Sequence, residues 1–282
     1  MKPKSVGLTL LVVFLVLVAG WVLYEKSDEV SLTPERVSIQ SPAGENDTSK
    51  APDDGQGHIP MPPRHPVPLP EVASTPAESQ PIELPFPTTL DQADAYLNER
   101  LQQLISEQDL LALVNLNFFL QKLVLFIDNL PEKSIPRLHL PITPPKPGFI
   151  TSGSGEQQII SKRNAVRYLA YVKLVEVIPD APLLKLYLGL YPLLQEIYRE
   201  TNGPNAHFND RLIQVIDDLL ETPEPLEPIR VTHHVSRFKY ADESLESRSA
   251  GQKILLRMGV ESTRRIKVKL SQLRQGLVRN DL

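Results

Sequence analysis

The feature that most restricts what this chain can form is an almost uninterrupted apolar run over residues 6–24. A helix of roughly 19 residues is about 28 Å long, which matches the hydrocarbon thickness of about 30 Å in a bilayer. Lys2 and Lys4 precede the run, and positive charge marks the end of a span that stays in the cytoplasm. We therefore expect a transmembrane signal anchor at residues 6–24. Residues 1–5 are then cytoplasmic, and the rest of the chain lies outside the cytoplasm.

The alternative interpretation of this run is a cleavable signal peptide, with Val18 and Gly20 as the small residues before the cleavage point. The apolar core of such a peptide is about 7 to 15 residues long, so the length of this run favours the anchor. The sequence contains no cysteine, which excludes disulfides, thiolate nucleophiles and zinc–thiolate sites. Stability outside the cytoplasm must therefore come from an apolar core.

Residues 25–88 are rich in proline and polar side chains and poor in large apolar ones. Proline withholds a main-chain donor, and so little apolar surface cannot offset the conformational entropy that folding removes. We expect a disordered proline-rich linker that spans about 40 Å as a coil and at most about 190 Å as polyproline II. A linker of this composition can instead serve as a ligand for a proline-recognising groove, although a spacer is the commoner role.

From residue 89 onwards, Leu, Ile, Val and Tyr recur at helical spacing, which predicts an all-α, mainly helical globular domain over 89–282. We expect proline-rich connections between its helices and at most a short hairpin around 229–235. A capping box formed by Thr89 and Gln92 starts the first helix, which runs to about residue 106. A cap at Ser106 begins a second, continuous helix to residue 127, whose polar interruptions argue against a second membrane span. Further helices are expected over 164–177, 180–200, 209–220, 249–258 and 261–278.

No residue spacing in the chain indicates a catalytic or metal site. A glycine-rich phosphate loop and a His-Glu-x-x-His helix are both absent from the sequence. His233 and His234 would alternate faces on a strand, and Asp217 and Asp218 would point about 100° apart on a helix. We predict no catalytic residue, no metal site and no cofactor, and we interpret these side chains as solvated.

The candidate binding surface has three parts: a helix face near Pro192, the turn at 208–211 and the segment 249–257. The tyrosines of the first part form either a ring-lined groove or ordinary core. Asn209 or Asp210 acts either in a binding loop or as a helix cap. The side chains that we predict to bind a partner are Tyr191, Gln195, Glu196, Phe208, Asn209, Asp210, Arg211, Ser249, Gln252, Lys253 and Arg257.

Charge is segregated along the domain, because acidic residues between 176 and 227 precede a basic C-terminal part between 253 and 279. The basic side chains can meet anionic lipid, an acidic polymer or the acidic helices of the same chain, and the last requires no additional molecule. Nucleic acid is not an expected partner, because the predicted topology places the domain outside the cytoplasm.

Several short motifs carry a family resemblance over about residues 164–274. They are RY at 167–168, YV at 171–172, LYPLLQE at 190–196, FNDRL at 208–212, VID at 215–217, SAGQK at 249–253 and LRMG at 256–259. With these motifs the chain resembles a family known as domain of unknown function 3014. The resemblance implies an uncharacterised, single-pass protein of the bacterial inner membrane with a proline-rich stalk and a periplasmic domain, and it implies no activity.

The sequence thus favours a domain that binds or scaffolds another envelope component, with an envelope protein as the expected partner and the membrane held through residues 6–24. An enzyme is the less favoured class. The alternative is a hydrolase that acts on cell-wall material through Glu196 or Asp210, for which both carboxylates should share a deep cleft. Under the binding hypothesis, Arg211→Ala should release the partner while the domain keeps its helices.

Overall fold

The structure is a computed structural model that describes residues 62–67, 85–135, 140–143, 145–146, 148–178, 180–226, 228–234 and 237–279. The expected membrane anchor at 6–24 and most of the expected linker lie outside these residues. Among the residues that are described, no helix combines the length and the apolar character that a membrane span requires.

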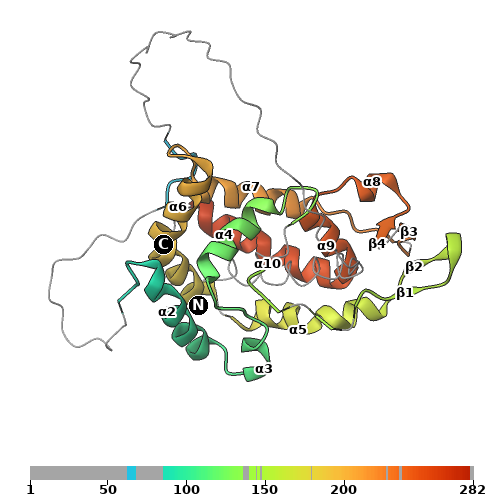
Figure 1. Ribbon diagram of the computed structural model, residues 1–282, viewed down its shortest axis with the longest axis horizontal. Coiled ribbons are helices and arrows are strands. Elements are labelled where there is room, and N and C mark those ends of the chain that lie inside the picture. The colour runs from blue at the N-terminus through green and yellow to red at the C-terminus, as the bar shows by residue number, and fades with distance from the viewer. Residues whose placement is uncertain are drawn as a thin grey trace, which may run out of the picture.

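Helices make up most of the described chain, which confirms the prediction of a mainly helical domain (Figure 1). Two small antiparallel ladders accompany them, one more than the single hairpin expected. A hairpin begins in the region predicted for it, around 229–235, but it extends to Tyr240, with Val231 opposite Tyr240 and His234 opposite Arg237. The helices are α2 (Leu90–Leu104), α3 (Gln108–Leu111), α4 (Phe119–Asn129), α5 (Arg163–Val177), α6 (Asp180–Asn202), α7 (Phe208–Leu220), α8 (Glu243–Glu246), α9 (Ala250–Met258) and α10 (Val260–Arg279). The strands are β1 (Thr151–Ser152), β2 (Ile159–Ile160), β3 (Val231–His234) and β4 (Arg237–Tyr240), and a 3₁₀ turn, η2, covers Gly155–Gln157.

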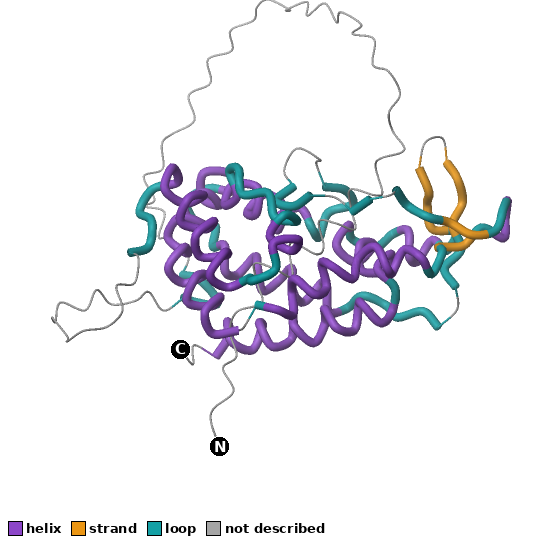
Figure 2. Tube along the Cα trace, turned by 90° about the horizontal axis from the view of Figure 1, so that it is seen from below, coloured by secondary structure: helices purple, strands orange, loops and turns teal. Residues whose placement is uncertain are grey.

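Helix α9 lies at the centre of the packing. All of its residues are buried, and it contacts α5, α7 and α10. Helix α10 in turn lies against α5 and α7, and α4 packs on α2, α6 and α7. The strands gather at one end of this helical body (Figure 2). The core is therefore built by helices, and the ladders cover its end.

The second helix is shorter than the predicted 107–127 helix, because a β-bridge interrupts it. Val114 bridges Ile142 in antiparallel fashion, and the Asn115 N–H donates to the Pro141 carbonyl at 2.9 Å. A proline-rich segment distant in sequence thus takes up main-chain groups that a continuous helix would use. This pairing explains why α3 ends at Leu111.

Helix α4 begins at a residue that helical periodicity does not mark as a boundary. Phe118 has φ 52°, in the left-handed region, and precedes the first helical residue. The carboxylate of Asp94 on α2 accepts the N–H of Phe118 at 2.6 Å and that of Phe119 at 3.0 Å. A carboxylate from another helix therefore caps α4.

The domain begins before residue 89, because Phe86 is part of its packing. The Phe86 ring lies 5.6 Å from that of Tyr96, and it also covers Gly189 on α6. A Cβ at Gly189 would lie 2.1 Å from the ring, so this close approach requires glycine. The hydroxyl of Thr89 makes no capping bond, and the Gln92 N–H instead donates to the Thr89 carbonyl at 3.3 Å. The predicted capping box is therefore not formed.

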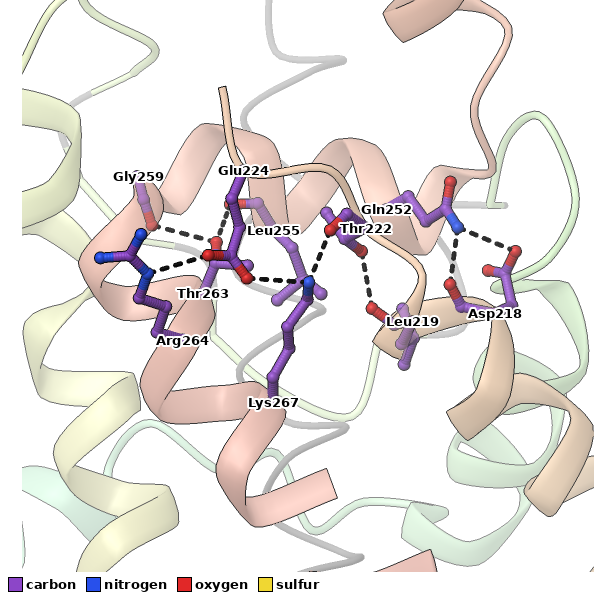
Figure 3. Close-up of polar contacts among 10 residues, drawn as sticks. All are labelled: Asp218, Leu219, Thr222, Glu224, Gln252, Leu255, Gly259, Thr263, Arg264 and Lys267. Atoms are coloured by element: carbon purple, nitrogen blue, oxygen red, sulfur yellow. Dashed lines mark hydrogen bonds and ion pairs between the residues drawn. The ribbon is translucent and has the colours of Figure 1, made fainter. Parts of the chain in front are cut away.

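The acidic helices and the basic C-terminal helix meet within the chain, which confirms one of the three alternatives for the charge pattern. Glu224 accepts from Arg264 at 2.8 Å and from Lys267 at 2.9 Å (Figure 3). Two further pairs join the same helix to α5 and α7, namely Arg265 with Glu176 and Arg274 with Asp217. The charge segregation thus corresponds to internal pairing of α10 with its neighbours.

Candidate functional site

The connection between α6 and α7 is held by the side chain of Gln195. The Oε1 atom of Gln195 accepts the hydroxyl of Tyr191 at 3.0 Å and the N–H of Phe208 at 2.9 Å. Its Nε2 atom donates to the Ala206 carbonyl at 2.7 Å. The chain leaves α6 at Gly203, whose φ of 92° suits glycine at a helix end. Tyr191 and Gln195 therefore shape the turn from inside the protein.

Phe208 and Asn209 start α7 with buried side chains. The Phe208 ring packs 5.6 Å from that of Tyr198. Asn209 is fully buried, and its Oδ1 atom accepts the Tyr187 hydroxyl at 2.8 Å. Burial raises the pKa of Tyr187 well above its ordinary value, so this hydroxyl stays protonated as the donor. The amide nitrogen of Asn209 is thereby aimed away from α6.

That amide nitrogen binds a segment of the expected linker. Asn209 Nδ2 donates to the carbonyl of His65 at 2.9 Å. The neighbouring carboxylate of Asp210 accepts the main-chain N–H of Arg64 at 2.9 Å and that of His65 at 2.8 Å. We call residues 62–67 the linker segment, and Asn209 with Asp210 the clamp. The clamp thus holds this stretch of chain by its main-chain atoms, at the point where it bends.

A cavity of about 700 Å³ lies between the linker segment and the start of α7. We call it the Asp210 cleft. The linker segment contributes Arg64 and His65 to its lining, and α6 and α7 contribute Tyr198 and Gln214 among others. Asp217, further along α7, also lines it. The cleft therefore combines an aromatic wall with charged and amide groups.

Arg211 belongs to the turn but is engaged in holding two helices together. Its Nε atom donates to Asp128 Oδ1 at 2.8 Å, and a terminal nitrogen donates to the Asp128 carbonyl at 2.6 Å. The other terminal nitrogen donates to Gln214 at 3.0 Å. Because these bonds join α7 to the end of α4, Arg211→Ala would disturb packing as well as the cleft. Asp210 is the better residue for a binding test.

Glu196 does not join this group. It is exposed on α6 and does not line the Asp210 cleft. The shared cleft that the hydrolase hypothesis requires for Glu196 and Asp210 is therefore not formed there. In the described part of the chain, no three His, Asp or Glu side chains come close enough together to hold a metal ion.

The third predicted part of the binding surface, 249–257, lies in the interior. The hydroxyl of Ser249 donates to Asp218 at 2.7 Å and caps α9 by accepting the N–H of Gln252 at 3.1 Å. The Gln252 amide donates to the main-chain carbonyl of Asp218 at 2.6 Å (Figure 3). Burial raises the pKa of the Asp218 carboxyl, and the Ser249 bond partly opposes this shift. These side chains therefore join α9 to α7.

Lys253 and Arg257, which were also predicted to bind a partner, are buried, with exposed fractions of only 7% and 4%. The guanidinium of Arg257 lies over the rings of Phe149 at 5.0 Å and Tyr240 at 5.6 Å. Burial lowers the pKa of Lys253, and Glu246 at 3.9 Å counters this shift. Polar residues in α9 suggested a surface, but here their side chains make contacts inside the protein.

Sequence reasoning missed Arg64 and His65, which lie in the expected linker. A signal was available, because these are the only residues between Pro62 and Pro66 that are not proline. They interrupt a stretch otherwise without main-chain donors. Both of those donors are used by the clamp.

Comparison with known proteins identifies one family. The model for "Protein of unknown function (DUF3014)" matches residues 119–274, which is more than half of the chain. The match includes α4 to α9 and most of α10, and it contains the clamp. Neither the curated proteins nor the solved structures contain a significant match to the chain.

Proposed function

The chain belongs to the DUF3014 family of proteins of unknown function, and from that premise we propose that it is a membrane-tethered scaffold of the bacterial envelope. In this proposal residues 6–24 cross the inner membrane once, with the N-terminus in the cytoplasm. Residues 25–88 are the stalk, and the helical domain binds another envelope protein in the periplasm. The apolar run and the proline-rich composition support this arrangement.

The observation that carries the binding role is the contact between the clamp and the linker segment. The clamp uses one carboxylate and one amide to bind main-chain N–H and C=O groups of a chain that bends at Arg64 and His65. Main-chain groups are common to all polypeptides, and domains can bind peptides of different sequence by such bonds. The Asp210 cleft therefore suits a protein segment better than a small metabolite.

A crosslinking experiment in intact cells tests the scaffold. A photo-reactive amino acid is placed at Gln214, which is exposed and lines the Asp210 cleft. The matched control position is Val166, which is 67% exposed on α5 and does not line this cleft. We expect an envelope protein to be captured from position 214, not from 166, and to be lost in Asp210→Ala.

A periplasm-active reporter fused after residue 281 tests the topology in the same cells. Activity of the reporter supports an external domain, and an inactive but stable fusion would overturn it. Equal capture from positions 214 and 166 would contradict the cleft as the binding site.

A further inference from the structure

The linker segment offers two main-chain donors to the clamp. In Pro62-Pro63-Arg64-His65-Pro66-Val67, the three prolines have no N–H, so Arg64 and His65 hold the only donors before Val67. Both donate to the two oxygens of one carboxylate, Asp210. Hydrogen bonds to an ionised acceptor are about twice as strong as neutral ones. The number and position of the donors thus match the acceptor.

Every second residue of the linker segment is partly buried, although the chain bends at Arg64 and His65. Pro63, His65 and Val67 are half-buried, while the residues between them are exposed. Val67 packs against the main hydrophobic core. The flanking prolines hold φ near the value of polyproline II, which lowers the entropy lost when the segment binds.

The receptor side is built from buried groups in the helical domain. Asn209 is fully buried and oriented by Tyr187, so its amide meets the His65 carbonyl without rearrangement. Asp210 lies in the first turn of α7, where the helix dipole favours a negative charge. The groups of the receptor therefore belong to the helical domain and not to the linker segment.

From this geometry we propose that the Asp210 cleft is a receptor for proline-flanked segments that bend so that two consecutive N–H groups face one carboxylate, and that residues 62–67 are its resident occupant. A partner segment of the same chemistry binds by displacing the linker segment. This inference deepens the proposed function and rests on it for the identity of the partner as an envelope protein.

Exchange at the cleft would change the reach of the domain. With the linker segment bound, residues 25–61 separate the proposed anchor from the domain, which is at most about 115 Å of polyproline II. With the linker segment released, residues 25–85 do so, and the upper limit rises to about 190 Å. Binding of a partner thus lengthens the tether.

Trypsin reports on the linker segment in the full-length protein in detergent micelles. It cleaves after Arg64, whose next residue is His65, and cleavage after Lys50 in the same stalk gives an internal reference. We expect Asp210→Asn to speed cleavage after Arg64, relative to Lys50, by about 10-fold or more, since charge-assisted bonds are lost. The control Glu196→Gln changes an exposed carboxylate on α6 that does not line the cleft, and it should leave this ratio unchanged.

Peptide competition on the wild-type protein provides a second test that does not depend on the folding of a variant. The peptide PPAHPV keeps both N–H groups and lacks the tryptic site, and PPPPPV lacks both N–H groups. At about 5 mM, above the roughly millimolar effective concentration of a tethered segment, PPAHPV should raise the cleavage ratio and PPPPPV should not.

Equal effects of the two peptides, or an unchanged ratio in Asp210→Asn, would overturn the receptor. If protection of Arg64 from trypsin increases with protein concentration, the segment in the cleft comes from a second copy of the protein. That result would overturn the proposal that the linker segment occupies the cleft of its own chain. No envelope component is present in this assay. If the peptide displaces the linker segment but no partner is captured in cells, only the scaffold is refuted. If a partner is captured in cells but the peptide does not displace the linker segment, only this inference is refuted.

Discussion

Two tyrosines on α5 should respond with opposite signs when their hydroxyls are removed. Tyr168 and Tyr171 are both buried, with exposed fractions of 0% and 2%. The hydroxyl of Tyr171 donates to the Thr143 carbonyl at 2.8 Å, whereas that of Tyr168 has no hydrogen-bond partner among the described residues. Burial raises the pKa of both, to about 12 for Tyr171, so both hydroxyls are protonated at neutral pH. The two positions therefore differ in hydrogen bonding and little in burial.

The expected magnitudes follow from this difference. A buried polar group without a partner costs about 1–3 kcal/mol, so Tyr168→Phe should raise the free energy of unfolding by about 1 kcal/mol. Tyr171→Phe breaks a bond and leaves a carbonyl unpaired, and it should lower the free energy of unfolding by about 1 kcal/mol. For a domain of this size each kcal/mol corresponds to about 2–4 °C in Tm.

Urea unfolding followed by far-ultraviolet circular dichroism measures both variants against wild type. A change of midpoint at constant slope reports stability alone. If Tyr168→Phe lowers the midpoint as much as Tyr171→Phe does, the hydroxyl of Tyr168 has a partner in solution and the reasoning is refuted.

Three further substitutions test the packing and the polar network. Gly189→Ala should lower the free energy of unfolding by about 1 kcal/mol, because the added Cβ would overlap the Phe86 ring. This loss is expected although alanine favours a helix over glycine. An unchanged urea midpoint would show that the ring moves freely. Because folding raises the pKa of Asp218, this carboxyl contributes to the free energy of unfolding in full below pH 3.8, its ordinary pKa. That contribution is lost as the pH rises through the raised pKa. The stability difference should therefore shift in favour of Asp218→Asn as the pH rises in that range. Hydrogen bonding from Arg264 lowers the pKa of Glu224. This carboxylate therefore contributes to the free energy of unfolding above pH 4.5, its ordinary pKa, and the contribution is lost as the pH falls through the lowered pKa. Glu224→Gln should thus lose stability only on the less acidic side, and urea midpoints measured across this pH range would show opposite trends for the two variants.

Helical periodicity and charge were sufficient to predict much of the domain. Helices α5, α6, α7, α9 and α10 begin and end within a few residues of the predicted bounds, because each has an apolar face and a local stop such as Pro179 or Gly203. The turn at 208–211 was also predicted as a candidate site, since polar residues after a glycine and a proline mark a connection. Segregated charge left three alternatives for the basic side chains, and the pairing of α10 with acidic residues of the same chain was the one that required no additional molecule.

Only the tertiary structure decided where long-range contacts replace local preferences. The gap between α3 and α4 depends on Ile142 and Asp94, and neither contact has a signal in helical spacing. The polar residues of α9 face the interior because Asp218 on another helix meets them there. The linker segment is held across more than 140 residues of sequence, by bonds with separations of 144 to 146. Local sequence sets the conformational preference of each segment, but a hydrogen bond between distant segments depends on how the whole chain packs.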